Sequence, residues 1–115
     1  MPKVITIGSA TMDVFVECDE ANIVSVCSKD RNADFMSYPY GSKIEISDFA
    51  TQVGGGGVNT ATNFANLGLN TSTIIKLGND ELNSIIKLKL AQSGVDIMNV
   101  IDSDKHLTGF SIILV

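Results

Sequence analysis

Hydrophobic and polar residues along this chain alternate with the two periods expected of strands and helices. Residues 3–7 predict a short buried strand that stops at Gly8, and residues 12–18 alternate as in a half-exposed strand. Residues 44–49 alternate again, with Ile44 and Ile46 expected to face inward. Further strands are expected at 22–27, 71–77, 97–101 and 108–115.

Two other stretches follow helical spacing. Residues 60–67 predict a helix whose apolar face joins Val58, Ala61 and Ala65, and Gly68 suits its C-terminal end. A second helix should begin after a cap at Asn79 or Asp80 and should end at Ser93 and Gly94. Its apolar positions are Leu82, Ile85, Ile86 and Leu90.

The segment 19–42 has the least regular pattern. Beyond the short strand at 22–27 it predicts a polar loop at 29–32 and a turn at 38–41. Taken in order, the elements give a strand, a hairpin-like excursion, and then alternating helices and strands. This order predicts an α/β fold in which a mostly parallel sheet carries an antiparallel flap.

Composition narrows the class of protein. The 115 residues suffice for one domain, and 44% hydrophobic with 18% charged residues indicates a globular chain. The net charge of −5 disfavours nucleic acid as a partner. No apolar stretch is long enough to span a bilayer, and the start of the chain does not resemble a signal peptide. Cys18 and Cys27 match no metal-ligand spacing, so we expect two reduced, part-buried thiols in a cytoplasmic protein, with a disulfide as the weaker alternative.

The four consecutive glycines from Gly54 to Gly57 are the most informative feature. They follow a predicted strand and precede a predicted helix, where free N–H groups favour oxygen-rich or anionic ligands. The alternative is an ordinary flexible loop. A phosphate-binding P-loop would need a Gly-Lys pair, which the chain lacks, and the dinucleotide fingerprint fails because Asn59 and Thr60 stand where Gly or Ala is required.

A different pattern does match. Four pieces, in order and at the right separation, resemble the N-terminal part of the ribokinase-like (PfkB) family of carbohydrate and nucleoside kinases. The pieces are GSATMD at 8–13, GGGGVN at 54–59, LGND at 77–80, and SGVD at 93–96 followed by TGFS at 108–111. The resemblance implies a ribokinase-like, Rossmann-like α/β fold with an antiparallel β flap formed by strands near 12–18, 44–53 and 108–115. Residues 1–115 would be the N-terminal part of that kinase domain.

The resemblance also assigns a substrate site, which would be lined by Thr11, Asp13, Gly55, Gly56 and Asn59. The chemistry suits a neutral polyol, because a carboxylate accepts hydrogen bonds from sugar hydroxyls and a glycine backbone admits a ring closely. Asp13 could instead be an ordinary solvated strand residue, and Asn59 could be a helix cap. Several sugar-kinase members have Lys at the position of Gly56, so the substrate stays open among a sugar, a sugar phosphate and a nucleoside.

Family members are much longer than this chain, and the resemblance places their catalytic aspartate and their ATP site in the second half. ATP and Mg²⁺ are therefore implied as cofactors whose sites lie largely outside residues 1–115, and no catalytic or metal-binding residue is expected here. The chain alone should be inactive. The alternatives are a non-catalytic sugar- or nucleoside-binding module and a nucleotide-binding α/β domain of unrelated chemistry. Neither nucleic acid nor membrane is an expected partner, and a homodimer through the flap is expected.

Overall fold

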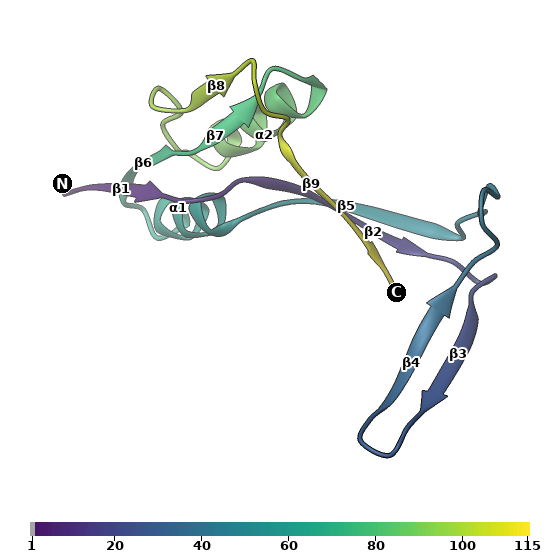
Figure 1. The fold of residues 1–115 in the computed structure, drawn as a ribbon. Coiled ribbons are helices and arrows are strands. Elements are labelled where there is room, and N and C mark those ends of the chain that lie inside the picture. The colour runs from purple at the N-terminus through teal and green to yellow at the C-terminus, as the bar shows by residue number, and fades with distance from the viewer. Residues whose placement is uncertain (1) are drawn as a thin grey trace. The chain divides into compact units, whose positions relative to one another are not determined.

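The structure of residues 2–115 was obtained as a computed structural model, and it divides into two compact units (Figure 1). The larger unit contains the chain up to Val14 together with Thr51–Ile112, and the smaller unit contains Phe15–Ala50 together with Ile113–Val115. The strands are β1 Lys3–Ile7, β2 Thr11–Glu17, β3 Asn22–Cys27, β4 Asn32–Ser37, β5 Asp48–Gly54, β6 Asn70–Ile74, β7 Lys76–Gly78, β8 Ile101–Ser103 and β9 Gly109–Leu114. The helices are α1 Gly56–Asn66 and α2 Glu81–Gln92.

Parallel pairing dominates the larger unit, as predicted. β1 lies parallel to β6 from the Lys3–Asn70 pair to the Ile7–Ile74 pair, and β7 lies parallel to β8. The single strand predicted at 71–77 is interrupted at Ile75, because the chain changes partner there from β1 to β8. The Ile75 carbonyl accepts the N–H of Ile101 at 2.9 Å, which marks that change.

The strand predicted at 97–101 is wrong. Only a single bridge between Ser72 and Asp96 forms in that region, and the strand β8 begins where the predicted one would end. The Asp96 side chain accepts the N–H of Met98 at 3.0 Å, and the Val100 N–H bonds the Ile97 carbonyl at 3.1 Å. These local bonds turn the backbone, so the β-branched residues of this segment cannot form a ladder.

Both helices end as predicted, but α1 starts earlier. It begins at Gly56 rather than at residue 60, so half of the glycine run is helical. Gly68 follows its last turn with φ +83°, a conformation that glycine adopts without strain. Asp80 caps α2 by accepting the N–H groups of Leu82 and Asn83, at 3.1 and 3.3 Å.

The core of the larger unit forms where both helices pack on the strands. Val58 and Ala61 bury the predicted apolar face of α1, and Ile86 and Leu90 bury that of α2. The remaining buried members are Ala10, Met12, Ile75, Leu77 and Val95. Ile85 is 49% exposed, so the predicted apolar stripe of α2 is only partly buried.

The smaller unit contains a strand that the sequence pattern did not predict. β3 pairs antiparallel with β4 from the Asn22–Ser37 pair to the Cys27–Asn32 pair, so most of the segment 19–42 is a hairpin. The predicted loop at 29–32 falls at its turn, where the Ser28 N–H bonds the Arg31 carbonyl at 2.9 Å. A turn also forms at 38–41, as expected, with Gly41 at φ +72°.

The strand predicted at 44–49 is displaced along the chain. β5 begins only at Asp48, and Ile46 is 44% exposed rather than inward-facing. β5, β2 and β9 form one sheet in that order. Neither helix within residues 2–115 has the length and apolarity needed to cross a membrane.

Candidate functional site

Two polar side chains of β2 converge on one glycine of β5. Thr11 and Asp13 are two positions apart and therefore lie on the same face of their strand. A Cβ atom built on Gly54 would lie 2.6 Å from Oδ2 of Asp13 and 3.4 Å from Oγ1 of Thr11. The carboxylate and the hydroxyl thus sit directly over the Gly54 backbone, where no side chain fits beneath them.

Both polar groups are available to a ligand. Thr11 and Asp13 are half-buried, and within residues 2–115 neither side chain makes a hydrogen bond. An ionised carboxylate is an acceptor with two oxygens, and a threonine hydroxyl both donates and accepts. The pair can therefore receive two hydroxyl groups of a polyol and donate one hydrogen bond in return.

The next three glycines differ in backbone conformation and in the space around them. Gly55 has φ +96°, and a Cβ there would lie 2.5 Å from the Ser9 carbonyl oxygen, so only glycine suits this position. Gly57 packs against Gly8 and Ile75, with a built Cβ 2.8 Å from the Ile75 side chain. Gly56 faces open space, with nothing within 4 Å of a built Cβ.

The amides at the start of α1 are occupied, which corrects the prediction of free N–H groups. The Gly56 N–H donates to Oγ of Ser9 at 3.1 Å, and the N–H groups of Gly57 and Val58 donate to the Ser9 carbonyl at 3.0 and 3.4 Å. No local sequence pattern indicates this role of Ser9, because the capped amide lies 47 residues away along the chain. These amides are therefore not available to a phosphate.

The remaining predicted polar residue of the site, Asn59, lies near the start of α1. Its exposed side chain lines a groove of about 650 Å³ between β5, α1 and α2, together with Met12, Gln52 and Lys89. Thr11 and Asp13 are not among the residues lining this groove. Asn59 is not a helix cap either, since Gly55 occupies that position without a side-chain hydrogen bond.

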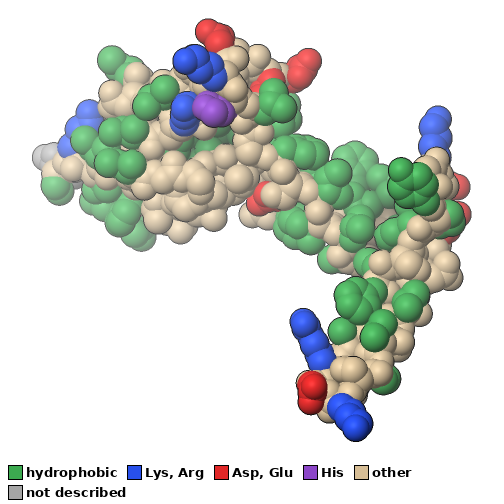
Figure 2. Space-filling model, viewed as in Figure 1, with side chains coloured by type: hydrophobic (Ala, Val, Ile, Leu, Met, Phe, Trp, Pro, Cys, Tyr) green, Lys and Arg blue, Asp and Glu red, His purple; other side chains and the backbone are tan. Residues whose placement is uncertain are grey.

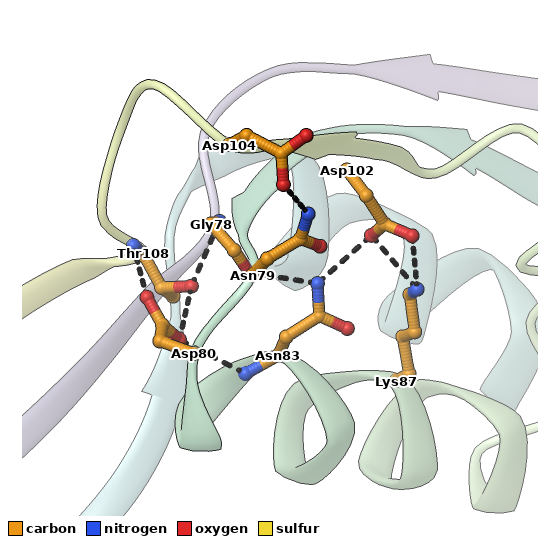
Figure 3. A network of polar contacts seen from close by, with 8 residues as sticks. All are labelled: Gly78, Asn79, Asp80, Asn83, Lys87, Asp102, Asp104 and Thr108. Atoms are coloured by element: carbon orange, nitrogen blue, oxygen red, sulfur yellow. Dashed lines mark hydrogen bonds and ion pairs between the residues drawn. The ribbon is translucent and has the colours of Figure 1, made fainter.

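A polar network surrounds the start of α2 (Figure 3). Besides capping the helix, Asp80 accepts the Thr108 N–H on Oδ2 and the Thr108 hydroxyl on Oδ1, both at 2.8 Å. The Thr108 oxygen in turn accepts the Gly78 N–H at 3.0 Å. These bonds, above all that from the Thr108 backbone, lower the pKa of Asp80 below its ordinary value and outweigh the effect of burial.

The same network continues toward β8. Asn83 donates to the Gly78 carbonyl and to the Asp102 carboxylate, each at 2.8 Å, and Lys87 contacts both Asp102 oxygens at 2.8 and 2.9 Å. The bond from Lys87, followed by that from Asn83, lowers the pKa of Asp102. Asn79 bonds Asp104 alongside. Within the described chain, no three His, Cys, Asp or Glu side chains cluster so as to hold a metal ion.

Comparison with known proteins identifies the family. The sequence matches the pfkB family carbohydrate kinase profile over residues 1–115. It is 37% identical over 78 residues to the 2-dehydro-3-deoxygluconokinase of Bacillus subtilis (strain 168), an alignment covering 67% of this chain and 24% of that protein. The fold resembles that of Arabidopsis thaliana ribokinase, solved with ribose and ATP, at 25% sequence identity. That comparison has a TM-score of 0.77 and covers 98% of this chain and 31% of the ribokinase.

A further ribokinase shows the same fold. The enzyme from Cryptococcus neoformans var. grubii serotype A, in complex with ADP, has a TM-score of 0.72 at 19% identity, over 99% of this chain and 30% of that protein. The chain thus spans about a quarter to a third of the length of these relatives. The predicted resemblance and α/β fold are confirmed, and the chain belongs to the pfkB family of carbohydrate kinases.

Proposed function

We propose that this chain provides the acceptor-substrate site of a small-molecule kinase that transfers the γ-phosphate of ATP to a hydroxyl of a sugar, sugar phosphate or nucleoside. The observation that carries the proposal is the convergence of Thr11 and Asp13 over Gly54. An acceptor with neighbouring hydroxyls would bind the Asp13 carboxylate, and its ring would lie against the backbone of half-buried Gly55 and exposed Gly56. Asn59 is the further polar residue of the proposed site, since its exposed side-chain amide can both donate and accept hydrogen bonds.

A sugar or sugar acid is the favoured acceptor class. The relative from Bacillus subtilis is named for a deoxy sugar acid, and the Arabidopsis thaliana ribokinase was solved with ribose. Gly56 supports some freedom in the acceptor, because the space in front of it is empty. An acceptor longer than ribose would have room there.

We place neither ATP nor Mg²⁺ on this chain. The first amides of α1 would be the natural cradle for a phosphate, but Ser9 already accepts their hydrogen bonds. The chain spans only part of its relatives, and we propose that it is the N-terminal part of a kinase domain, with the catalytic and nucleotide sites in the remainder. Residues 1–115 alone would then bind an acceptor without phosphorylating it.

Cys18 and Cys27 are both free thiols, although Cys27 is exposed rather than part-buried. A cytoplasmic location for the protein is still a prediction.

Calorimetric titration of the chain with ribose, 2-dehydro-3-deoxygluconate and adenosine tests the proposal. We expect one of these probes to bind, and Asp13→Asn to weaken that binding about ten- to a hundredfold, the loss expected when a charge-assisted hydrogen bond is removed. Asp19→Asn is the matched control, because Asp19 is exposed and makes no hydrogen bond within residues 2–115. Absence of binding by every probe, or equal binding by the Asp13 variant, would contradict the proposed site.

The alternative of a non-catalytic binding module makes a separate prediction. An ATP-consumption assay with the bound acceptor should stay at background for the chain in either case. The same assay is then run on a longer polypeptide that contains this chain followed by the rest of the kinase domain. It should consume ATP only if the chain is part of an enzyme. A longer polypeptide that binds the acceptor but consumes no ATP would support the binding module.

A further inference from the structure

Asp80 makes more hydrogen bonds than a helix cap requires. A cap needs one side-chain oxygen to accept N–H groups of the first turn, and Oδ1 of Asp80 does this for Leu82 and Asn83. Its second oxygen, Oδ2, accepts the Thr108 N–H at 2.8 Å. The Thr108 hydroxyl also donates to Oδ1, at 2.8 Å. These four donors point at one carboxylate, so a neutral amide could not satisfy them together.

Thr108 is held firmly by this arrangement. It is 5% exposed, its hydroxyl donates to Asp80, and its oxygen accepts the Gly78 N–H at 3.0 Å. Gly78 packs closely against this loop, since a Cβ there would lie 2.6 Å from the Thr108 nitrogen and 2.7 Å from Oδ2 of Asp80. The backbone at 108 is therefore fixed relative to the first turn of α2 (Figure 3).

The residue after Thr108 contacts the candidate acceptor site. A Cβ built on Gly109 would lie 2.9 Å from the Ala10 carbonyl oxygen and 3.0 Å from the Thr11 methyl group. The Thr11 hydroxyl, on the other branch of the same side chain, faces Gly54. Because a β-branched side chain has few χ1 rotamers, packing of its methyl group against Gly109 fixes where its hydroxyl points.

We propose that Asp80 is a positioning residue for acceptor binding, which holds Thr108 and Gly109 so that Thr11 keeps its hydroxyl directed to the space over Gly54. The link runs from the cap of α2 through one residue of the loop to the start of β9. The effect on acceptor affinity rests on the proposed function, whereas the effect on the Thr11 rotamer does not.

Two kinds of variant separate positioning from capping. Asp80→Asn keeps an oxygen that can cap α2, since Asn is as good a cap as Asp, but it presents an NH₂ group to the Thr108 N–H. Thr108→Val removes the hydroxyl, whereas Thr108→Ser retains it. Lys87→Gln is the control. Lys87 lies on the same helix α2, and its replacement breaks the ion pair with Asp102 of β8 without affecting Thr108.

The readouts are the methyl NMR signal and χ1 coupling constants of Thr11, and calorimetric affinity for ribose and 2-dehydro-3-deoxygluconate. In Asp80→Asn and Thr108→Val we expect averaged Thr11 rotamers and binding weakened about three- to thirtyfold, the range of coupling through intermediate residues. Thr108→Ser and Lys87→Gln should behave as the parent chain does in both readouts.

The inference is overturned if Asp80→Asn lowers the melting temperature but leaves the Thr11 rotamer and the affinity unchanged, because Asp80 would then be only a cap. If the parent chain binds no probe, the proposed function fails by itself. The Thr11 signal then decides the positioning role, and an unchanged signal in Asp80→Asn overturns it.

Discussion

The Ser9 hydroxyl accepts the Gly56 N–H at 3.1 Å, so the loop after β1 caps a helix that begins 47 residues later in the sequence. The Ser9 carbonyl completes this cap by accepting the Gly57 N–H at 3.0 Å. A helix that starts with glycines has little intrinsic tendency to form there. Contact with Ser9 thus explains why α1 starts inside the glycine run.

Replacement of Ser9 tests this cap. Ser9→Ala leaves the Gly56 N–H without its protein acceptor, and we expect the free energy of unfolding to fall by about 0.5–1.5 kcal/mol, the usual net value of one hydrogen bond. Ser9→Thr keeps a hydroxyl and should retain most of the stability. Urea unfolding of both variants gives the comparison, and an unchanged midpoint in Ser9→Ala would show that water replaces the hydroxyl at no cost.

Two adjacent glycines should respond in opposite ways to alanine. Gly57→Ala places a methyl group 2.8 Å from the Ile75 side chain and 2.9 Å from the Gly8 backbone, so we expect destabilisation. Overpacking of this kind costs about 1–3 kcal/mol. Gly56→Ala meets nothing and should be neutral or stabilise by up to about 1 kcal/mol, since alanine favours the helix. Thermal unfolding of the two variants measures the difference. An equal loss of stability in both would contradict the close packing of Gly57 against Ile75 and Gly8.

Acid should weaken the fold through Asp80. The Thr108 backbone bond lowers its pKa in the folded chain, whereas the unfolded chain has the ordinary value of about 3.9. The ionised form therefore favours folding: its contribution is present above about pH 4 and is lost as the pH falls through the lower folded pKa. Asp102 acts in the same direction through Lys87.

Unfolding by urea between about pH 6 and pH 3 measures this dependence. The Asp80→Asn variant should lose less stability over that interval than the parent chain, because residue 80 no longer titrates. Asp19→Asn removes an exposed carboxylate that makes no hydrogen bond within residues 2–115, and it should show the parent slope. Equal slopes for the parent and Asp80→Asn would assign the acid sensitivity to other groups.

The sequence predicted those elements whose patterns are local. The strand at 3–7 and the strand at 22–27 have the predicted bounds, and Asp80, one of the two predicted candidates, caps α2. The strand at 3–7 is not the buried strand that was predicted, because only Thr6 in it is buried. The strand predicted at 97–101 failed because local hydrogen bonds turn the backbone there. Two other errors arise where distant contacts decide the structure. Ile75 interrupts a β-branched run because its neighbours pair with different strands, and β4 forms because β3 supplies its partner.

The candidate site shows the same division. The glycine run stood out from the sequence itself, but Thr11 and Asp13 were assigned to the same site only by the resemblance to a family. No periodicity in the sequence places β2 beside Gly54. Ser9 and Thr108 were not predicted as supports of that site, because each acts on residues far away in sequence. A serine or threonine that follows a strand is too common a pattern to indicate such a role.

Self-association should be tested at the β3–β4 hairpin, where the structure exposes apolar residues. A homodimer through the flap was predicted, but Val16 of the flap strand β2 is only 7% exposed, so its replacement would disturb folding. The β3–β4 hairpin offers exposed apolar residues instead, as Figure 2 shows along its length. Val24 and Phe35 are a cross-strand pair, 46% and 54% exposed, and Val26 lies two positions along the same face.

A two-stranded hairpin is at best marginally stable by itself, so an apolar face of this kind is expected to be covered by a partner. We expect light scattering at micromolar concentration to give at least twice the 12.2 kDa mass of the chain. The pair Val24→Thr and Phe35→Thr keeps β propensity but removes apolar surface, and it should shift the mass toward the monomer. Tyr40→Thr is the control, because it removes an exposed aromatic residue from the turn after the hairpin. A monomeric parent chain would show that the hairpin face is not an interface. A dimer that persists in the double variant and dissociates in the control would show the same.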